Sequence, residues 1–350
     1  MVEQLSTNYN PGVSIIICCY NSEQRIVRTL EHIKNQQVSD NFHFEVIVVN
    51  NASSDGTAEV SRAYLETTDL DFTLVDEPNP GLSNARMAGV ASAKYKYLLF
   101  CDDDNFLCDT YLLNGIKILN EHKNIMILGG FGEPVFEADE PSWFSKYALN
   151  FACGLVSGAK EGGVCNVQDV YGAGMFVRKV FFQVLREIKF KSIISDRKGD
   201  TLISGGDTEY VLLTKYLGYK TAMDGRLRFG HLMPKTRMTL AYLKKLHFGF
   251  GRTRLYTQAY ANIFTDKPIK TIQLKLPIWK DKLLHKKREL RRFYPKIWFK
   301  DLNEKNLDYI LKYEALRGEI QELSSIKNRY SGILEEIKEL KFRIEKYKNV

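Results

Sequence analysis

Short apolar runs alternate with stretches of helical character along roughly the first hundred residues of the chain. Each run is long enough for a buried strand and too short for a helix. The four runs are Val13–Cys19, Phe44–Val49, Phe72–Val75 and Tyr97–Cys101. Capping and turn residues after the first three favour helices that reach about Gln36, begin near Thr57, and end near Ala93. This alternation predicts an α/β fold with right-handed crossovers and a mostly parallel sheet flanked by helices.

The pattern becomes mixed between about residues 125 and 265. Strands are expected at Ile125–Gly130, at Val170–Val177 with glycine interruptions, and as two short segments at Lys220–Met223 and Leu227–Gly230. Helices are expected from Asp207 to about Leu217 and from about Thr239 onward. These elements predict a single domain over residues 1–266, with one half at about 1–125 and the other at about 126–266.

Apolar residues recur at alternating spacings of four and three near the C-terminus. The positions are Ile326, Tyr330, Ile333, Ile337, Leu340, Ile344 and Tyr347. Three heptads with Glu and Lys flanks indicate a helical, coiled-coil-like region at 301–350 that contacts a second copy or a partner protein. A helix folded back on its own domain is the alternative.

The formal net charge of +8 comes from one segment of the chain. Residues 267–300 hold 12 basic and 2 acidic side chains, whereas residues 1–266 have a net charge of −2. Aromatic residues accompany this basic segment, namely Trp279, Phe293, Tyr294, Trp298 and Phe299. Basic and aromatic side chains together favour an anionic membrane surface as a partner. The alternative is a basic face packed beside the larger domain. No nucleic-acid-binding motif accompanies the charge, so nucleic acid is not expected as a partner.

Several classes of protein are excluded by composition. No apolar stretch approaches the roughly 18 residues of a membrane-spanning helix, and the polar N-terminus lacks the pattern of a signal peptide. The six cysteines form no CxxC pair and no metal-finger spacing, which favours reduced core residues. We therefore expect a cytoplasmic protein, with a peripheral position on the inner face of the membrane if the basic segment binds lipid.

Polar residues follow three of the predicted strands. Tyr20-Asn21, Asn50-Asn51 and Asp102-Asp103-Asp104 stand at carboxyl ends of strands, where ligands bind in parallel α/β sheets. Three adjacent carboxylates repel one another, and Mg²⁺ or Mn²⁺ would relieve that repulsion and bridge to a diphosphate. A solvated acidic turn with helix-capping carboxylates is the alternative.

Asp207 follows two glycines, Gly205 and Gly206, at the start of a predicted helix. Its carboxylate is a candidate general base for an incoming hydroxyl, and a helix N-cap is the alternative role. Glu209 is a candidate for orienting a substrate, or it interacts only with the helix dipole.

Three further side chains are candidates for ligand contact. His231 ends a short strand and is a candidate third metal ligand, although a lone histidine is more often structural. Arg252 follows a glycine-rich turn and suits phosphate oxygens, unless it is simply solvated. Trp143 stands in a predicted loop where its ring suits the apolar face of a sugar, whereas the other large aromatic residues are core candidates.

In combination these residues resemble the family 2 glycosyltransferases, which are inverting nucleotide-sugar transferases with the GT-A fold. Seven motifs occur in the expected order over about residues 13–255. They are Val13–Asn21, Val49–Thr57, Asn79–Arg86, Phe100–Asn105, Tyr171–Arg178, Gly206–Glu209, and His231 with Gly251–Arg252. Two departures stand out: Asn50-Asn51 replaces a pair of aspartates frequent in the family, and Gly206 stands where many relatives have Glu.

The resemblance implies a role for each candidate. Tyr20, Asn21, Asn50, Asn51, Arg86, Asp102 and Asp103 would bind the nucleotide sugar. Asp102, Asp104 and His231 would hold Mg²⁺ or Mn²⁺, and Asp207 would deprotonate the acceptor. Trp143, Glu209 and Arg252 would contact acceptor or phosphate.

The implied function is transfer of a sugar to a hydroxyl of a glycan or lipid-linked glycan, in assembly of surface polysaccharide or glycoconjugate. A non-catalytic scaffold acting through its tail and a nucleotidyltransferase are the alternatives.

Overall fold

The computed structural model describes residues 9–39, 41–194, 202, 205–267, 277–293 and 306–349. The chain divides into two compact units. The sheet unit comprises the described residues of 1–139, 145–187 and 210–234. The helical unit comprises those of 140–144, 188–209 and 235–350. Two helices, α6 (Phe144–Tyr147) and α8 (Gly206–Tyr216), contain residues of both units.

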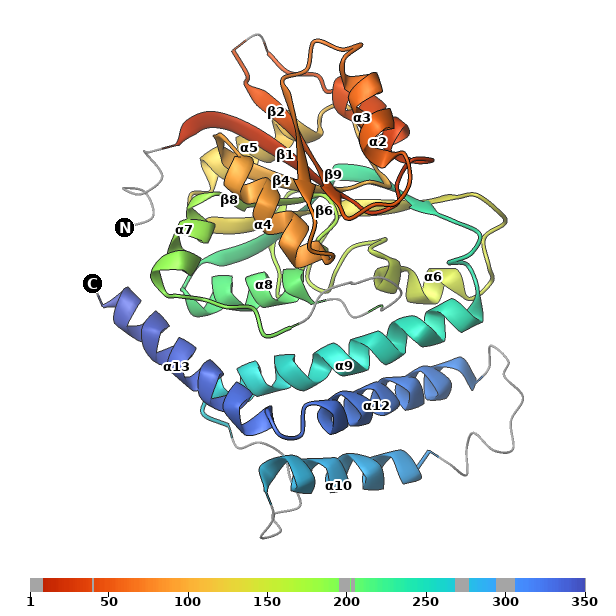
Figure 1. Ribbon diagram of the computed structural model, residues 1–350, viewed down its shortest axis with the longest axis vertical. Coiled ribbons are helices and arrows are strands. Elements are labelled where there is room, and N and C mark those ends of the chain that lie inside the picture. Colours follow the sequence, from red (N-terminus) through yellow and green to blue (C-terminus); the bar gives the residue numbers. More distant parts are fainter. Residues whose placement is uncertain are drawn as a thin grey trace. The chain divides into compact units, whose positions relative to one another are not determined.

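The sheet unit is built on one nine-stranded mixed sheet (Figure 1). Its strands are β1 (Asn10–Cys19), β2 (Phe44–Asn51), β3 (Phe72–Glu77), β4 (Tyr95–Asp102), β5 (Asn105–Leu107), β6 (Ile125–Phe136), β7 (Val164–Asn166), β8 (Met175–Arg178) and β9 (Lys220–Met233). Their spatial order is β3-β2-β1-β4-β8-β6-β9-β5, and β7 pairs with β9. The first four strands are mutually parallel, whereas β8 is antiparallel to β4 and β6.

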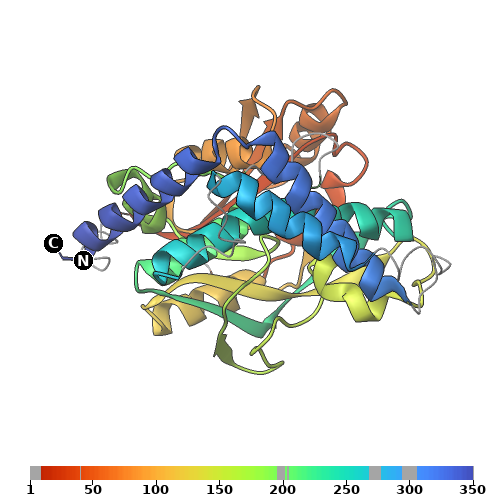
Figure 2. The ribbon, with the colours of Figure 1, turned by 90° about the horizontal axis from the view of Figure 1, so that it is seen from below.

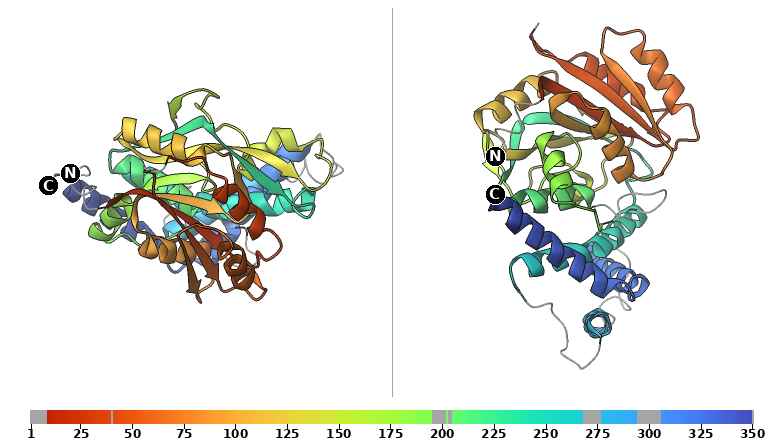
Figure 3. Two further views of the ribbon diagram at one scale, coloured as in Figure 1. Left: turned by 90° about the horizontal axis from the view of Figure 1, so that it is seen from above. Right: turned by 60° about the vertical axis from the view of Figure 1, so that its left-hand side comes forward.

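Helices cover both faces of this sheet. They are α2 (Ile26–Lys34), α3 (Thr57–Leu65), α4 (Leu82–Ser92), α5 (Tyr111–Glu121) and α7 (Val180–Glu187), with a short 3₁₀ helix at Ala148–Phe151. Alternate residues of a strand point to opposite faces. Ile15 and Ile17 of β1 share a core with α2, α3 and α5, whereas Ile16 points the other way and packs beneath α4. Figure 3 shows the strands between these helices from two further directions. Burial on both faces explains why β1 and β2 are continuous apolar runs.

Four long helices make up most of the helical unit (Figure 2). They are α9 (Leu240–Phe264), α10 (Ile278–Arg291), α12 (Leu307–Ser325) and α13 (Tyr330–Lys348). The helix α12 packs against both α9 and α10, and α13 packs against α9. Thr239 caps α9, because its hydroxyl accepts a hydrogen bond from the Tyr242 N–H at 3.1 Å. No helix in the described ranges combines the length and the apolar character needed to cross a bilayer.

Two strand predictions differ from the structure. The expected break between Lys220–Met223 and Leu227–Gly230 is absent, and β9 is continuous. Buried Asp224 is neutralised there by a two-point ion pair with Arg226, with contacts of 2.9 and 2.7 Å, so the polar stretch stays in the strand. The predicted strand at Val170–Val177 shortens to Met175–Arg178, since Gly174 has a φ of +62° that a strand does not accommodate.

The C-terminal helices also differ from expectation. Five of the seven heptad positions, from Tyr330 to Ile344, are buried within the chain itself. The apolar stripe of α13 therefore packs on its own helical unit, which was the alternative to a coiled coil with another chain. The boundary expected at residue 266 stays a prediction; in the structure α9 groups with α12 and α13 in the helical unit. Residues 268–276 and 294–300 of the basic segment, including Tyr294, Trp298 and Phe299, lie outside the described residues.

Candidate active site

Three polar clusters meet at one edge of the sheet, as the sequence predicts. In the register of the sheet, Cys19 of β1 pairs with Asn50 of β2, and Cys18 pairs with Asp102 of β4. The ends of β2 and β4 therefore flank the end of β1, after which Tyr20 and Asn21 follow. This edge is where parallel α/β sheets bind their ligands.

The turn after β1 presents an aromatic ring and is tied to the loop after β2. The Tyr20 side chain is 48% exposed at the sheet edge. Asn21 has a φ of +50°, a conformation that asparagine tolerates better than most residues. Its side-chain oxygen accepts a hydrogen bond from the Ser54 N–H at 2.8 Å, and its own N–H donates to Ser53 Oγ at 3.1 Å. These bonds hold the two loops in one arrangement.

The two asparagines at the end of β2 have different tasks. Asn51 is buried, and it bonds the Asn79 carbonyl at 2.7 Å and the Gly81 N–H at 2.8 Å. Asn51 thus organises the loop before α4. The Asn50 amide donates to Asp76 at 3.0 Å, but its oxygen is buried and has no hydrogen-bond partner within the described chain. A buried acceptor of this kind is available to a donor from water or from a ligand.

The three consecutive aspartates have separate environments. Asp103 is buried and accepts hydrogen bonds from Ser22 and from Arg25, the latter at 2.8 Å. Burial and the neighbouring Asp104 raise the pKa of Asp103, and Arg25 opposes the rise. Asp102 is only half-buried at the edge. Sequence reasoning missed Ser22 and Arg25, although their place in the first turn after the Tyr20-Asn21 turn was a usable signal.

Asp104 and His231 form a buried pair. Cross-strand pairing of β5 with β9 places His231 opposite Asn105, and His231 Nε2 lies 3.4 Å from Asp104 Oδ1. Its Nδ1 lies 2.8 Å from the Phe151 carbonyl, so Nδ1 is the donor and Nε2 faces the carboxylate. Burial by itself lowers the pKa of His231, but the charge of Asp104 outweighs it and raises the pKa. A cation at this pair would reverse that preference, because a ligating imidazole is neutral.

Two other residues that the sequence predicts to contact a ligand are buried among protein side chains. Arg86 of α4 is buried, and its guanidinium lies 5.6 Å from the centre of the Phe100 ring. Trp143 is only 7% exposed and packs beside Phe144, which leaves little of its ring for a sugar. Their predicted ligand contacts stay predictions.

The remaining candidates lie in the helical unit. Asp207 is the second residue of α8, half-buried, and its carboxylate accepts the Thr208 N–H at 2.8 Å. Glu209 is fully buried, with hydrogen bonds to Tyr260 at 2.6 Å, to the Ile193 N–H at 3.2 Å and to Ser192. Arg252 is paired with Glu322 at 2.6 Å. Glu209 and Arg252 are thus engaged with protein groups, and Asp207, half-buried at the start of its helix, is bonded to the Thr208 N–H.

The described residues contain no set of three His, Cys, Asp or Glu side chains arranged to hold a metal ion. Asp104 and His231 supply two suitable ligands. Asp102 stands two residues before Asp104, and its N–H donates to the Asn105 side-chain oxygen at 3.0 Å, while the Asn105 amide nitrogen donates to Asp104.

Comparisons with known proteins agree with the fold and with the motifs. The family model described as glycosyl transferase family 2 matches residues 14–180. Poly-beta-1,6-N-acetyl-D-glucosamine synthase of Staphylococcus epidermidis is 33% identical over 109 residues, which is 30% of this chain and 26% of that protein. The minor teichoic acid biosynthesis protein GgaB of Bacillus subtilis is 27% identical over 117 residues, 33% of this chain and 13% of that protein.

Among solved structures, the mannosyltransferase PcManGT from Pyrobaculum calidifontis matches with a TM-score of 0.56 and 16% identity, covering 96% of this chain and 88% of that one. This likeness supports the predicted GT-A fold class. The chain spans a third or less of the length of the curated relatives it matches. The sequence match includes the strand ends that carry Tyr20-Asn21, Asn50-Asn51 and Asp102–Asp104, and over residues 14–180 the chain is similar to glycosyl transferase family 2.

Proposed function

We propose that the protein transfers a sugar from a nucleoside diphosphate sugar to a hydroxyl of a glycan or lipid-linked glycan, with inversion at the anomeric carbon. The observation that carries this proposal is the single sheet edge shared by Tyr20-Asn21, Asn50 and Asp102–Asp104. This edge combines an exposed aromatic ring, an unused buried amide oxygen and a group of carboxylates. Those are the groups that a base, a ribose and a cation-bound diphosphate require.

The donor would lie along this edge. The Tyr20 ring offers a face for stacking a nucleobase, and the buried Asn50 oxygen would accept a base N–H. Asn21 and Asp102 would contact the nucleoside. Asp103 and Arg86 are buried and would support the nucleotide-binding side chains from the protein interior. Arg25 holds the Asp103 carboxylate in place. The solved fold neighbour was determined with GDP-Man and Mn²⁺, which is consistent with a nucleotide-sugar donor in this chain.

Asp104 and His231 are of the ligand types that Mg²⁺ or Mn²⁺ takes in proteins, and a third ligand would join them. Asp104 would supply oxygen, and His231 would supply Nε2, because its Nδ1 is already engaged with the Phe151 carbonyl. This second bond orients the imidazole in the way that metal-ligating histidines usually require. Asp102 would complete the set. When bound, the cation would stabilise negative charge on the departing diphosphate.

Asp207 would act on the acceptor. Its carboxylate would take the proton from the acceptor hydroxyl while the oxygen of that hydroxyl attacks the anomeric carbon. The bond from that carbon to the diphosphate breaks in the same displacement, so the configuration inverts. No protein nucleophile is needed, and burial raises the pKa of the Cys19 and Cys101 thiols, which disfavours a reactive thiolate there.

The acceptor class follows from the relatives and from the basic segment. Two of the curated relatives are named for poly-beta-1,6-N-acetyl-D-glucosamine synthesis and for minor teichoic acid biosynthesis. We extend that class, surface polysaccharide and glycoconjugate assembly, to this chain as part of the proposal. The segment 267–300 would hold the protein on an anionic membrane surface, and a cytoplasmic position on the inner face of the membrane would then follow.

The Asp207→Asn variant tests the proposal. The amide cannot accept the proton, so turnover with a matched donor and acceptor should fall by about 10²- to 10⁴-fold, while donor binding stays within about threefold. Transfer is measured with Mg²⁺ or Mn²⁺ and again with chelator, which should abolish it. Asp69→Asn, in an exposed loop, is the matched control. Near-normal turnover of Asp207→Asn would rule out this base, and full activity in chelator would rule out the metal.

A further inference from the structure

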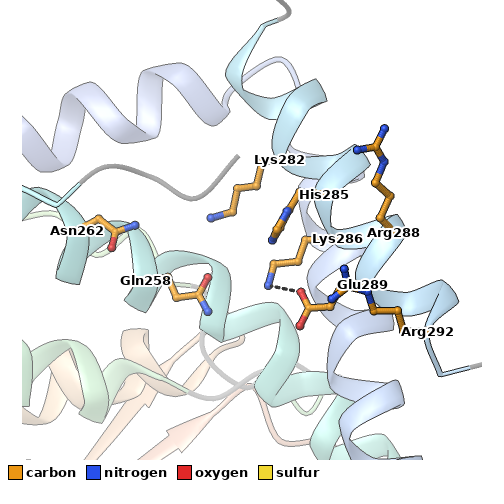
Figure 4. A pocket seen from close by; sticks show the side chains of 8 residues that line it. All are labelled: Gln258, Asn262, Lys282, His285, Lys286, Arg288, Glu289 and Arg292. Atoms are coloured by element: carbon orange, nitrogen blue, oxygen red, sulfur yellow. Dashed lines mark hydrogen bonds and ion pairs between the residues drawn. The ribbon is translucent and has the colours of Figure 1, made fainter. Parts of the chain in front are cut away.

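A cavity of about 750 Å³ lies within the helical unit, between α9 and α10 (Figure 4). Two amide side chains of α9, Gln258 and Asn262, line one side. The other side is a basic stretch of α10. Figure 4 shows Lys282, His285 and Lys286 extending from α10 toward α9, whereas Arg288 points away from them. None of these residues belongs to the candidate active site.

The lining of this cavity carries an excess of positive charge. Lys282, Lys286, Arg288 and Arg292 are four cations against a single carboxylate, Glu289. With His285 neutral, the lining has a net charge of +3. Lys286 is compensated, because its ammonium lies 3.3 Å from Glu289 and 2.7 Å from Glu319 of α12. The other cations have no such pairs within the described chain.

Lys282 is the decisive side chain. It is only 2% exposed, yet it has neither a hydrogen bond nor an ion pair with any described residue. Its nearest aromatic contact is the Tyr330 ring, 6.0 Å from the ammonium nitrogen. An ammonium that is buried without a counter-charge is costly. Burial and the neighbouring Lys286 accordingly lower the pKa of Lys282 to about 8, against a smaller opposing effect of Glu319, so the group still carries charge near neutral pH.

We propose that this cavity binds a phosphate-bearing anion, held by Lys282 and Lys286 with the amides of Gln258 and Asn262 as further donors. A tetrahedral phosphate accepts several hydrogen bonds at once, and ammonium groups bind it as point charges. The volume accommodates a diphosphate with room for part of what it is attached to. The same chemistry is presented by a soluble diphosphate and by the headgroup of an anionic phospholipid. This inference stands on the helical unit alone and does not depend on the proposed transferase activity.

The test uses the full chain with inorganic diphosphate as the probe. Calorimetry is done in chelator without divalent cations, because a cation would recruit diphosphate to the strand-end carboxylates. Lys282→Met keeps the length and apolar stem of the side chain but removes the charge. It should raise the dissociation constant at least tenfold. Lys287→Met removes the same charge from an exposed position of the same helix outside the cavity and should change it by less than threefold.

A second variant guards against an effect on folding. Gln258→Glu places a carboxylate on the opposite wall of the cavity and should weaken diphosphate binding to a similar degree. Helical content and melting temperature are measured for each protein. Lys282→Met should melt no lower than the wild type, because it loses an unpaired buried charge, and diphosphate should raise the melting temperature of the wild type only.

Vesicles of phosphatidylcholine, with and without phosphatidylglycerol, distinguish the two sources of phosphate. If Lys282→Met weakens both diphosphate binding and flotation on anionic vesicles, the natural ligand is a lipid headgroup. If only diphosphate binding falls, the ligand is a soluble phosphate compound. Absence of diphosphate binding, or equal binding by Lys282→Met and Lys287→Met, overturns the proposal. If Asp207→Asn loses transfer but binds diphosphate as the wild type does, the proposed transferase activity and the proposed anion site are independent of each other.

Discussion

Asp102, Asp103 and Asp104 are consecutive in sequence, but their carboxyl groups face different partners. Asp103 accepts from Ser22 and Arg25, and Asp104 faces His231. A sequence motif of three acids identifies the place of the chemistry, whereas the partner of each carboxylate comes from the turn before α2 and from β9. The same holds for Asn50 and Asn51, of which only Asn50 keeps an acceptor without a partner in the described structure.

Glu209 shows how strongly burial changes a carboxyl group. Glu209 accepts hydrogen bonds from Ser192 Oγ, from the Tyr260 hydroxyl at 2.6 Å and from the Ile193 N–H at 3.2 Å. Burial, the largest cause, raises the pKa of Glu209 from 4.5 to about 7 against these hydrogen bonds. The site favours the protonated acid.

The stability of the helical unit should therefore fall as the pH rises through about 7. The folded pKa of Glu209 lies above its unfolded value of 4.5, so its contribution is fully present below pH 4.5 and is lost across this window. The loss is on the order of 3 kcal/mol. Glu209→Gln mimics the neutral acid and should remove this pH dependence. Urea unfolding followed by tryptophan fluorescence reports on the helical unit, since the sheet unit contains no tryptophan.

Glu66→Gln, an exposed residue beyond α3, is the control and should keep the wild-type pH dependence. If Glu209→Gln lost as much stability as the wild type between pH 5 and pH 8, the assignment of this dependence to Glu209 would be wrong.

At the scale of elements, the crossing of α9 and α12 depends on two glycines. A Cβ atom at Gly251 would lie 1.9 Å from the Ala315 carbonyl oxygen, and one at Gly318 would lie 2.0 Å from the Phe248 carbonyl oxygen. Backbone atoms cannot yield as a flexible side chain does. The motif residue Gly251 therefore has a packing role, and its neighbour Arg252 reinforces the same contact through Glu322.

Gly251→Ala should destabilise the helical unit by about 1–3 kcal/mol, because the added methyl forces the two helices apart. Gly332→Ala is the matched control, since α13 has open space at Gly332. It should stabilise the protein by about 0.5–1 kcal/mol through helix propensity. Both are measured by urea unfolding with tryptophan fluorescence. An unchanged midpoint for Gly251→Ala would show that the helices do not meet at this crossing.

At the scale of the whole molecule, the apolar stripe of α13 is already covered within one chain. Ile333, Ile337, Leu340 and Ile344 are each at most 4% exposed. A coiled coil with a second copy would require these side chains to leave the helical unit and lose that burial.

The protein should therefore be monomeric, with a mass close to 40.3 kDa by light scattering. The mass should not change when exposed Phe342, at 67% exposure on α13, is replaced by Glu. A mass near twice the monomer value that falls in the Phe342→Glu variant would instead indicate association through this helix.

Most of the sheet could be predicted from the sequence. The strands β1, β2 and β4 are buried on both faces and so appear as uninterrupted apolar runs. Alternation with helices then determines parallel pairing and brings their carboxyl ends together. Prediction was weaker where polar residues are compensated locally, as Asp224 is by Arg226 in β9. It was also weaker where a backbone angle decides, as at Gly174 before β8.

The sequence by itself determined the fold class and the strand ends that carry the candidate site, because periodicity and turn chemistry are local properties. Only the tertiary structure decided which of these polar groups have partners. Glu209, Arg252 and Asn51 are engaged by residues from other parts of the chain, whereas the Asn50 oxygen and the Lys282 ammonium have no hydrogen-bond partner within the described residues. Satisfaction of a buried polar group depends on contacts between distant residues, and no local pattern encodes those contacts.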